Sequence, residues 1–295
     1  MTFASLLPTL LFVALGLVMF GLGLSLTVAD FTRLLRHPRA VVLALVLQVG
    51  VLPAACYALI VLLGVSPVYA VGLMLLAVSP GGVSANLFSH LFGGNVAMKI
   101  SLTAINTVLS IVSLPLITNW AIRTFADTGQ VVPLQFGKVA EVIAIVLAPV
   151  LLGMAAHRRW PGLSARAERP MKAFSAFVLA AFALIAIAKE WSALVESFGG
   201  IGPAVLLFNA LSLGAGYYLA RAAGLDTSMA TAISFEIGIH NSTLAIFIAL
   251  SVLQNFPLAL PAALYSVSMY LMATLFGLLV LRRPGRADRA AAAQG

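Results

Sequence analysis

Long apolar runs separated by short loops restrict what this chain can fold into. A helix of about 20 apolar residues is long enough to cross a bilayer. Only 9% of the residues are charged, against about 25% in soluble domains. The runs are continuous instead of alternating, which does not fit a transmembrane barrel. We therefore predict an all-α polytopic membrane protein with nine transmembrane helices. They are expected at about residues 6–26, 40–63, 68–92, 96–124, 136–156, 173–188, 201–220, 227–253 and 258–281.

The basic residues of the loops predict the orientation of the chain. Of the 17 Lys and Arg residues, thirteen fall on one side of the predicted spans, three fall on the other, and Lys99 lies within a span. Basic loops stay in the cytoplasm, so the tail at residues 282–295 is expected inside the cell (inner) membrane and the N-terminus outside it. This distribution accounts for the net charge of +8, and no nucleic-acid partner is expected.

Two of the predicted spans are interrupted near their middle. The segment 68–92 contains Pro80-Gly81-Gly82, and the segment 227–253 contains Gly238 among polar residues. Proline removes a backbone donor, and glycine permits non-helical angles. Irregular backbone at membrane depth persists only where it is buried in protein or lines a wet cavity. Taken singly, the first segment could be a kinked lipid-facing helix and the second a polar helix–helix contact.

Together, the two interruptions predict an inverted repeat. The two interrupted spans cross the membrane in opposite directions in the predicted orientation, and each is followed by one further span. Spans one to four then correspond to spans six to nine, and the fifth span is unmatched. Inverted repeats with discontinuous helices are typical of secondary transporters, whose substrate and ion sites lie near the midplane.

Two opposite charges lie inside the predicted spans. Glu236 is the only acid, and Lys99 the only base, deep within such a span. A charge near the bilayer centre costs about 2.5–3.5 kcal/mol on insertion scales, so the two are expected to pair. The competing explanation is that Lys99, about one turn after Gly93-Gly94-Asn95, snorkels to the cytoplasmic interface. Lys99, Thr103 and Asn106 are spaced i, i+4, i+7, which places them on one helix face.

Four motifs resemble motifs of the bile acid:sodium symporter family. In chain order they are Met19-Phe20-Gly21-Leu22-Gly23-Leu24, Ser79-Pro80-Gly81-Gly82-Val83-Ser84-Ala85-Asn86, Gly94-Asn95-Val96-Ala97 and Phe235-Glu236-Ile237-Gly238-Ile239-His240-Asn241-Ser242. The ordered combination is specific and extends from the first predicted span to the eighth. The resemblance implies a secondary active transporter that moves organic anions by alternating access, generally with sodium. Bile acids and small carboxylate metabolites are the implied substrates.

The resemblance also implies two domains within the lipid bilayer. A panel domain would comprise residues 1–39 and 136–200. A core, or transport, domain would comprise residues 40–125 and 201–281, with the two interrupted helices crossing inside it. Bacterial relatives commonly have ten helices, and this chain is expected to lack the first of them.

Carried over residue by residue, the resemblance implies two sodium sites that share one carboxylate. The implied ligands are Glu236, Asn86 and Thr103 for the first site, and Glu236, Gln48 and the carbonyl oxygens of Ile237 and Ile239 for the second. The crossing would also hold the substrate. The implied substrate-binding residues are Asn241, Ser242, Gly82, Val83, Ser84 and Asn86, with Val83 in place of a residue that is polar in some relatives.

Three departures from the family pattern weaken the implied sodium sites. Ala85 and Lys99 replace hydroxyl ligands of the first site, and His240 replaces a glutamine of the second. Sodium requires several hard oxygen ligands, and an ammonium at 4 Å repels it by about 4 kcal/mol at an effective dielectric of 20. We expect Lys99 to occupy the first site as a tethered cation paired with Glu236. The coupling ion would then be Na+ retained at Gln48, Glu236 and His240, or H+ carried by a titratable side chain. No other cofactor is expected.

Other functions find less support in the residues. No His-Glu-x-x-His motif or pair of aspartates is present, and His240 and Ser242 lack an orienting acid, so an intramembrane enzyme is not expected. A channel, or a carrier of the same fold that resembles the arsenite and auxin exporters, remains an alternative. The segment from Glu236 to Ser242 favours the bile acid family over those exporters.

Overall fold

The computed structural model describes residues 37–82, 84–125, 136–164 and 191–281, together with single residues and short runs at 13–29 and 166–174. The α-helices with defined bounds are α3 (Pro38–Val46), α4 (Leu52–Leu63), α5 (Pro67–Ala77), α6 (Ala85–Leu91), α7 (Val96–Phe125), α8 (Phe136–Arg159), α10 (Trp191–Ala222), α11 (Thr227–Gly238), α12 (Ser242–Phe247) and α13 (Leu260–Phe276). Shorter π and 3-10 turns are η1 (Leu47–Val51), η2 (Ile248–Val252), η3 (Pro257–Ala259) and η4 (Gly277–Leu281). The predicted all-α class is confirmed.

Four helices in the described part of the chain are long and apolar enough to cross a membrane. They are Pro38–Leu63, Val96–Phe125, Phe198–Ala222 and Pro257–Leu281. These bounds coincide closely with four predicted spans. The predicted span 136–156 forms α8, whereas the spans 6–26 and 173–188 fall largely outside the described residues. The chain is therefore a multi-pass helical membrane protein, as its apolar runs predict.

A π-helical turn at Leu47–Val51 joins α3 to α4. Pro53 has no N–H group to donate to the carbonyl four residues before it. The N–H of Leu52 instead reaches back five residues to the carbonyl of Leu47. Such turns occur frequently at functional sites. This one carries Gln48, whose side chain is buried against the segment that follows α5.

Both interrupted spans are broken where the sequence predicts. Helix α5 ends at Ala77 and α6 begins at Ala85, while α11 ends at Gly238 and α12 begins at Ser242. Val83 lies outside the described residues. An antiparallel β-bridge joins the two breaks at Gly81 and His240. The bonds of this crossing run from Gly82 N to Ile239 O at 2.7 Å and from Asn241 N to Pro80 O at 2.8 Å. Backbone groups released by the breaks therefore pair with each other, which satisfies them away from water.

Glycine is required where the two breaks touch. A Cβ atom on Gly81 would lie 2.5 Å from Oε2 of Glu236, and one on Gly82 would lie 3.1 Å from the carbonyl oxygen of His240. The absence of a side chain at these two positions lets α11 bring its carboxylate against the first break. The Pro80-Gly81-Gly82 motif therefore has two roles. It prevents α5 from continuing, and it allows the two breaks to approach closely.

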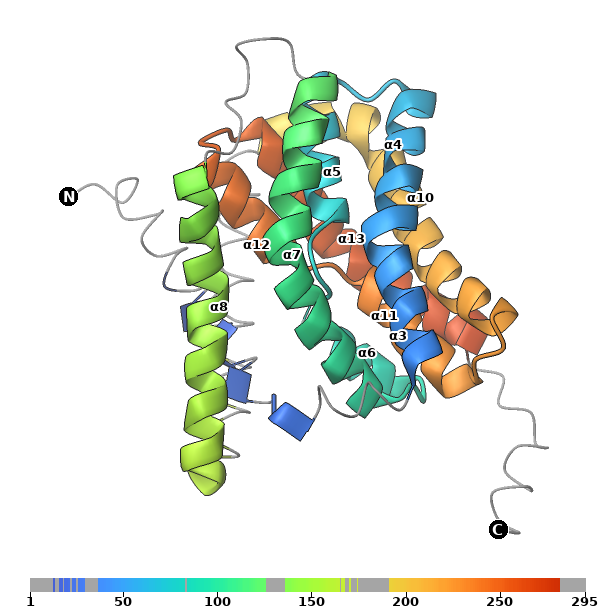
Figure 1. Cartoon of the computed structure of the whole chain (residues 1–295). Coiled ribbons are helices and arrows are strands. Elements are labelled where there is room, and N and C mark those ends of the chain that lie inside the picture. The colour runs from blue at the N-terminus through green and yellow to red at the C-terminus, as the bar shows by residue number, and fades with distance from the viewer. Residues whose placement is uncertain are drawn as a thin grey trace.

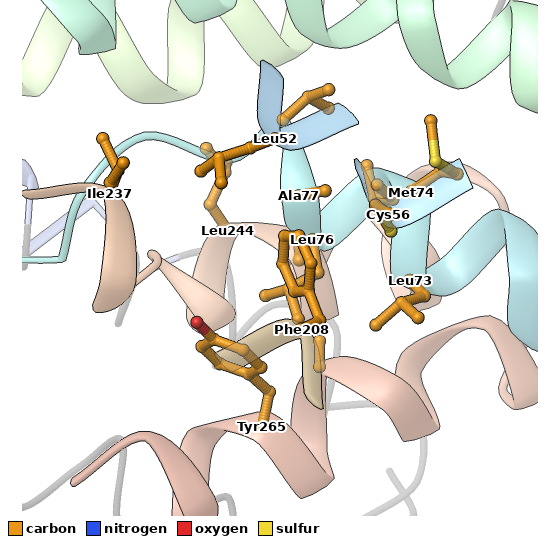
Figure 2. Close-up of a cluster of buried hydrophobic side chains, with 14 of the residues drawn as sticks. Leu52, Cys56, Leu73, Met74, Leu76, Ala77, Phe208, Ile237, Leu244 and Tyr265 are labelled. Carbon is orange, nitrogen blue, oxygen red and sulfur yellow. The ribbon is translucent and has the colours of Figure 1, made fainter. Parts of the chain in front are cut away.

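Figure 2 shows a buried apolar cluster that includes residues next to both breaks, such as Ala77 and Ile237. It includes Leu52, Leu76, Phe208 and Leu244, which come from α4, α5, α10 and α12. Tyr265 of α13 lies in the same cluster, and its hydroxyl donates to the carbonyl of Gly238 at 2.8 Å. Helix α8 lies at one edge of the molecule beside α7 (Figure 1). Apolar side chains of α4, α5, α10, α12 and α13 therefore pack beside the crossing.

Candidate ion and substrate site

Glu236 lies in the last turns of α11 and is completely buried. Its Oε1 accepts a hydrogen bond from Asn106 Nδ2 at 2.8 Å. Its Oε2 accepts from the Thr103 hydroxyl at 2.6 Å and contacts the Lys99 ammonium at 3.1 Å. Both oxygens of the carboxylate thus have polar partners, which a buried charge requires.

The Lys99 ammonium also has a complete set of polar partners. Its Nζ atom lies 3.1 Å from Glu236 Oε2, 2.8 Å from Thr103 Oγ1 and 3.1 Å from the carbonyl oxygen of Gly82. An ammonium has three donors, so all three are used. The side chain has 0% exposure, which rules out snorkelling to the interface in this structure. Lys99 therefore connects α7 to both interrupted helices.

Helix α7 positions its three polar side chains by simple periodicity. The helix begins after Asn95, whose side chain accepts from the N–H of Met98 at 3.0 Å and caps the first turn. The backbone N–H of Asn95 donates to the carbonyl of Ser228 at 3.0 Å, which ties the start of α7 to the start of α11. From this start, the predicted i, i+4, i+7 face meets Glu236, and all three of its residues contact that carboxylate.

A second set of polar side chains meets at the carbonyl of Ser79. Gln48 Nε2 donates to this oxygen at 3.0 Å and to the carbonyl of Ala77 at 3.2 Å. His240 Nδ1 donates to the same Ser79 oxygen at 3.1 Å. The imidazole of His240 stacks on Phe208, with ring centroids 5.6 Å apart, and meets Tyr265 edge-on at 5.4 Å. Gln48 and His240 therefore flank one carbonyl of the first break.

Two acceptor atoms of this second set have no described hydrogen-bond partner. They are Gln48 Oε1 and His240 Nε2, and both are buried. The carbonyl of Ile237 also loses its usual helical donor, because the N–H of Asn241 bonds to Pro80 instead. The Ile239 carbonyl accepts from Gly82 N. Unpaired buried acceptors in a native site point to a water molecule or an ion.

The described members of the predicted substrate-binding set lie at the crossing, and several of their polar atoms have no described hydrogen-bond partner. Asn241 is 9% exposed and accepts from the N–H of Leu244 at 3.1 Å, which caps α12. The Ser242 hydroxyl contacts only the Met269 sulfur, at 3.8 Å, among its described neighbours. Both amide atoms of Asn86 are buried with no described partner. Gly82 is buried, Ser84 is partly exposed, and Val83 lies outside the described residues.

The residue pattern does not predict two contacts of the candidate site. The carbonyl of Gly82 binds the Lys99 ammonium, and the hydroxyl of Tyr265 binds the carbonyl of Gly238. The glycine-rich breaks do signal that carbonyls lose their helical partners. Which side chain reaches each carbonyl depends on how the helices cross, and no sequence spacing reports it.

A multi-pass helical chain whose two interrupted helices cross beside a buried ion pair has the architecture of a membrane transporter. The chain belongs to the sodium bile acid symporter family, because the model of that family matches residues 12–197. The resemblance carried by the four motifs is thereby confirmed.

Similar proteins carry names of sodium-dependent transporters. The probable sodium/metabolite cotransporter BASS1 of rice chloroplasts is 31% identical over 261 residues, which cover 88% of this chain and 63% of the relative. The uncharacterized sodium-dependent transporter YocS of Bacillus subtilis is 29% identical over 255 residues, which cover 86% of this chain and 77% of the relative. The human ileal sodium/bile acid cotransporter is 26% identical over 282 residues, covering 92% and 78%. These relatives are transporters and not enzymes.

Proposed function

We propose that this protein is a secondary active transporter that moves organic anions by alternating access. The observation that carries the proposal is the crossing, where two broken helices bond to each other beside a buried ion pair. Ionisable residues and broken helices at membrane depth are energetically costly, and they typically mark the substrate and ion sites of transporters. Membership of the sodium bile acid symporter family supports it.

The proposal includes nine spans arranged as an inverted repeat in the inner membrane, with the N-terminus outside and the C-terminus in the cytoplasm. The order of elements supports the repeat. In the sets α5–α6–α7 and α11–α12–α13, two short helices flank a break and precede a long helix. Residues 40–125 and 201–281 would move as a core against a panel of residues 1–39 and 136–200.

The substrate is proposed to bind at the crossing. Ser84 and Asn86 are its partly exposed polar residues, whereas Asn241 is 9% exposed. The amide atoms of Asn86 lack described partners. Gly82, Val83 and Ser242 complete the proposed lining. The names of the relatives support a bile acid or a small carboxylate metabolite as the class of anion.

The first of the two implied cation positions is proposed to hold the Lys99 ammonium in place of sodium. A sodium ion there would need the oxygens of Glu236, Thr103 and Asn86. Two of these residues already contact the ammonium, together with the carbonyl of Gly82. The residues present therefore do not fit a sodium ion at this position. A sodium effect on stability that Asn86→Ala abolishes would contradict this assignment.

The second position is proposed to keep room for one coupling cation. Gln48 Oε1, with the carbonyls of Ile237 and Ile239, would supply oxygen ligands for Na+, and His240 Nε2 supplies a further lone pair. The two unpaired acceptors support this fit. Glu236 is engaged by Lys99, so the position has less negative charge than the family pattern implies. A proton remains the alternative coupling ion.

Counterflow tests the carrier function. Purified protein would first be screened for thermal stabilisation by bile acids, small carboxylates, arsenite and indole acetate. Liposomes preloaded with the best unlabelled anion are then diluted into a trace of the labelled anion. Transient accumulation that saturates with concentration is expected of a carrier. Linear flux without counterflow would identify a channel and contradict the proposal.

A further inference from the structure

The proposed core contains very few charged residues. In residues 40–125 and 201–281 they are Lys99, Arg123, Arg221, Asp226 and Glu236. Three of these are exposed at or near helix ends. Only Lys99 and Glu236 are buried, and they contact each other at 3.1 Å. The buried part of this region therefore holds one positive and one negative charge side by side.

The one buried imidazole described in this region does not alter that balance. His240 Nδ1 donates to the carbonyl of Ser79, and Nε2 has no acceptor in the described structure for a second proton. A protonated imidazole has two donors to satisfy. In this arrangement His240 is neutral, and the buried charges sum to zero.

We infer that the buried part of the empty core carries no net charge, and that the core changes orientation without a bound cation and without responding to the membrane potential. This inference rests on the proposed carrier function. An unpaired carboxylate at Glu236 would be strongly disfavoured in a low-dielectric core and would need a cation to cross. Here the cation is covalently attached to α7, so it is present in every cycle.

The direct consequence concerns the return step, in which the empty core moves back to its starting orientation after releasing the anion. A carrier whose empty core buries no net charge returns in the absence of sodium and catalyses net movement of its anion. The charge moved in a cycle is then the charge of the anion together with any cation at the second position.

The return step can be followed without substrate by measuring how fast a thiol at the crossing reacts with a reagent present on one side of the membrane. Cys56 is the single cysteine and is buried, so Cys56→Ala provides a thiol-free background. Ser84→Cys then places a reporter at the crossing. Its modification by a membrane-impermeant maleimide is followed in proteoliposomes containing sodium or N-methylglucamine. A valinomycin-clamped potassium gradient sets the potential in a parallel series.

The Cys56→Ala, Ser84→Cys reporter chain, which keeps Lys99 and Glu236, should label in N-methylglucamine without sodium, at rates that agree within about twofold at both potentials. A full elementary charge that crossed the membrane would change the ratio of orientations about 50-fold per 100 mV. Lys99→Ser leaves Glu236 without its ammonium. Its labelling should slow about tenfold or more in N-methylglucamine and recover in sodium.

A double variant separates charge from structure. Lys99→Met with Glu236→Gln has no buried charge, and in the same reporter background it should label without sodium, like the chain that keeps both charges. Labelling of the parent chain that requires sodium or follows the potential would overturn the inference, while the carrier proposal would stand if counterflow is seen. If the reporter is labelled from one side of the membrane only, in every variant and under every condition, both the inference and the carrier proposal would be overturned.

Discussion

At the scale of single residues, the buried pair depends on hydrogen bonds as much as on charge. Taking two charges out of water is expensive, and their mutual attraction offsets this only when the remaining donors and acceptors are satisfied. Lys99 uses all three of its donors, and Glu236 receives bonds at both oxygens. Thr103 is central to this arrangement, because its hydroxyl contacts both charges.

Replacing that hydroxyl should therefore be costly. Thr103→Val keeps the shape of the side chain but removes the partner of Lys99 at 2.8 Å and of Glu236 at 2.6 Å. Hydrogen bonds to charged groups contribute about 1.5–3 kcal/mol each, so the apparent melting temperature of the detergent-purified protein should fall clearly. Thr103→Ser, which keeps the hydroxyl, should lose much less. Equal losses in the two variants would show that the hydroxyl is unimportant.

The glycine at the crossing leads to a second residue-scale prediction. Gly81→Ala would place a Cβ against the carboxylate of Glu236, and overpacking of this kind costs about 1–3 kcal/mol. Thermal denaturation and anion counterflow should both be impaired. Gly200→Ala is the control, because its Cβ would meet nothing within 4 Å in α10. A Gly81→Ala variant as stable as Gly200→Ala would contradict the close contact.

Part of the site was predictable at this scale. The i, i+4, i+7 spacing of Lys99, Thr103 and Asn106 fixes one face of a helix, and the rarity of charges in apolar spans marks Glu236 as the partner. The contact of Lys99 with the carbonyl of Gly82 was not predictable. It depends on the relative placement of three helices, which leaves no mark in residue spacing.

At the scale of elements, each break is held by groups from other helices. Gln48 donates to two carbonyls released at the end of α5. Tyr265 of α13 donates to the carbonyl of Gly238 at the end of α11. These bonds replace the backbone bonds that the breaks remove, so the interrupted helices are ordered parts of the fold.

Removing the hydroxyl of Tyr265 should weaken the second break. Tyr265→Phe leaves the carbonyl of Gly238 without this buried donor, and a loss of about 1 kcal/mol is expected. The measurement is thermal denaturation in detergent. Tyr270→Phe, at a position that is 42% exposed on the same helix, serves as the matched control and should have little effect. No difference between the two variants would argue against the bond.

The positions of the breaks follow from local chemistry, whereas their partners do not. Proline and paired glycines predict where α5 ends, and polar residues around Gly238 predict the second interruption. The π turn at Leu47–Val51 precedes Pro53, but the sequence does not show which hydrogen bonds shift there. Nothing in the pattern of α13 distinguishes Tyr265 from an ordinary apolar-face tyrosine.

At the scale of the whole molecule, hydropathy and the order of motifs determine most of the account. The apolar runs predict a multi-pass helical protein, and four motifs in order predict its family, which the family match confirms. The number of spans, the inverted repeat and the two domains stay predictions. They involve segments such as 173–188 that lie largely outside the described residues.

The central claim is that the Lys99 ammonium takes the place of a sodium ion beside Glu236. Equilibrium binding of radioactive sodium to the purified protein, at constant ionic strength, tests it most directly. Lys99→Ser restores a hydroxyl and frees the carboxylate, so it should bind one more sodium ion per chain than the parent protein does. Equal numbers of bound sodium ions in the parent protein and in Lys99→Ser would contradict the claim.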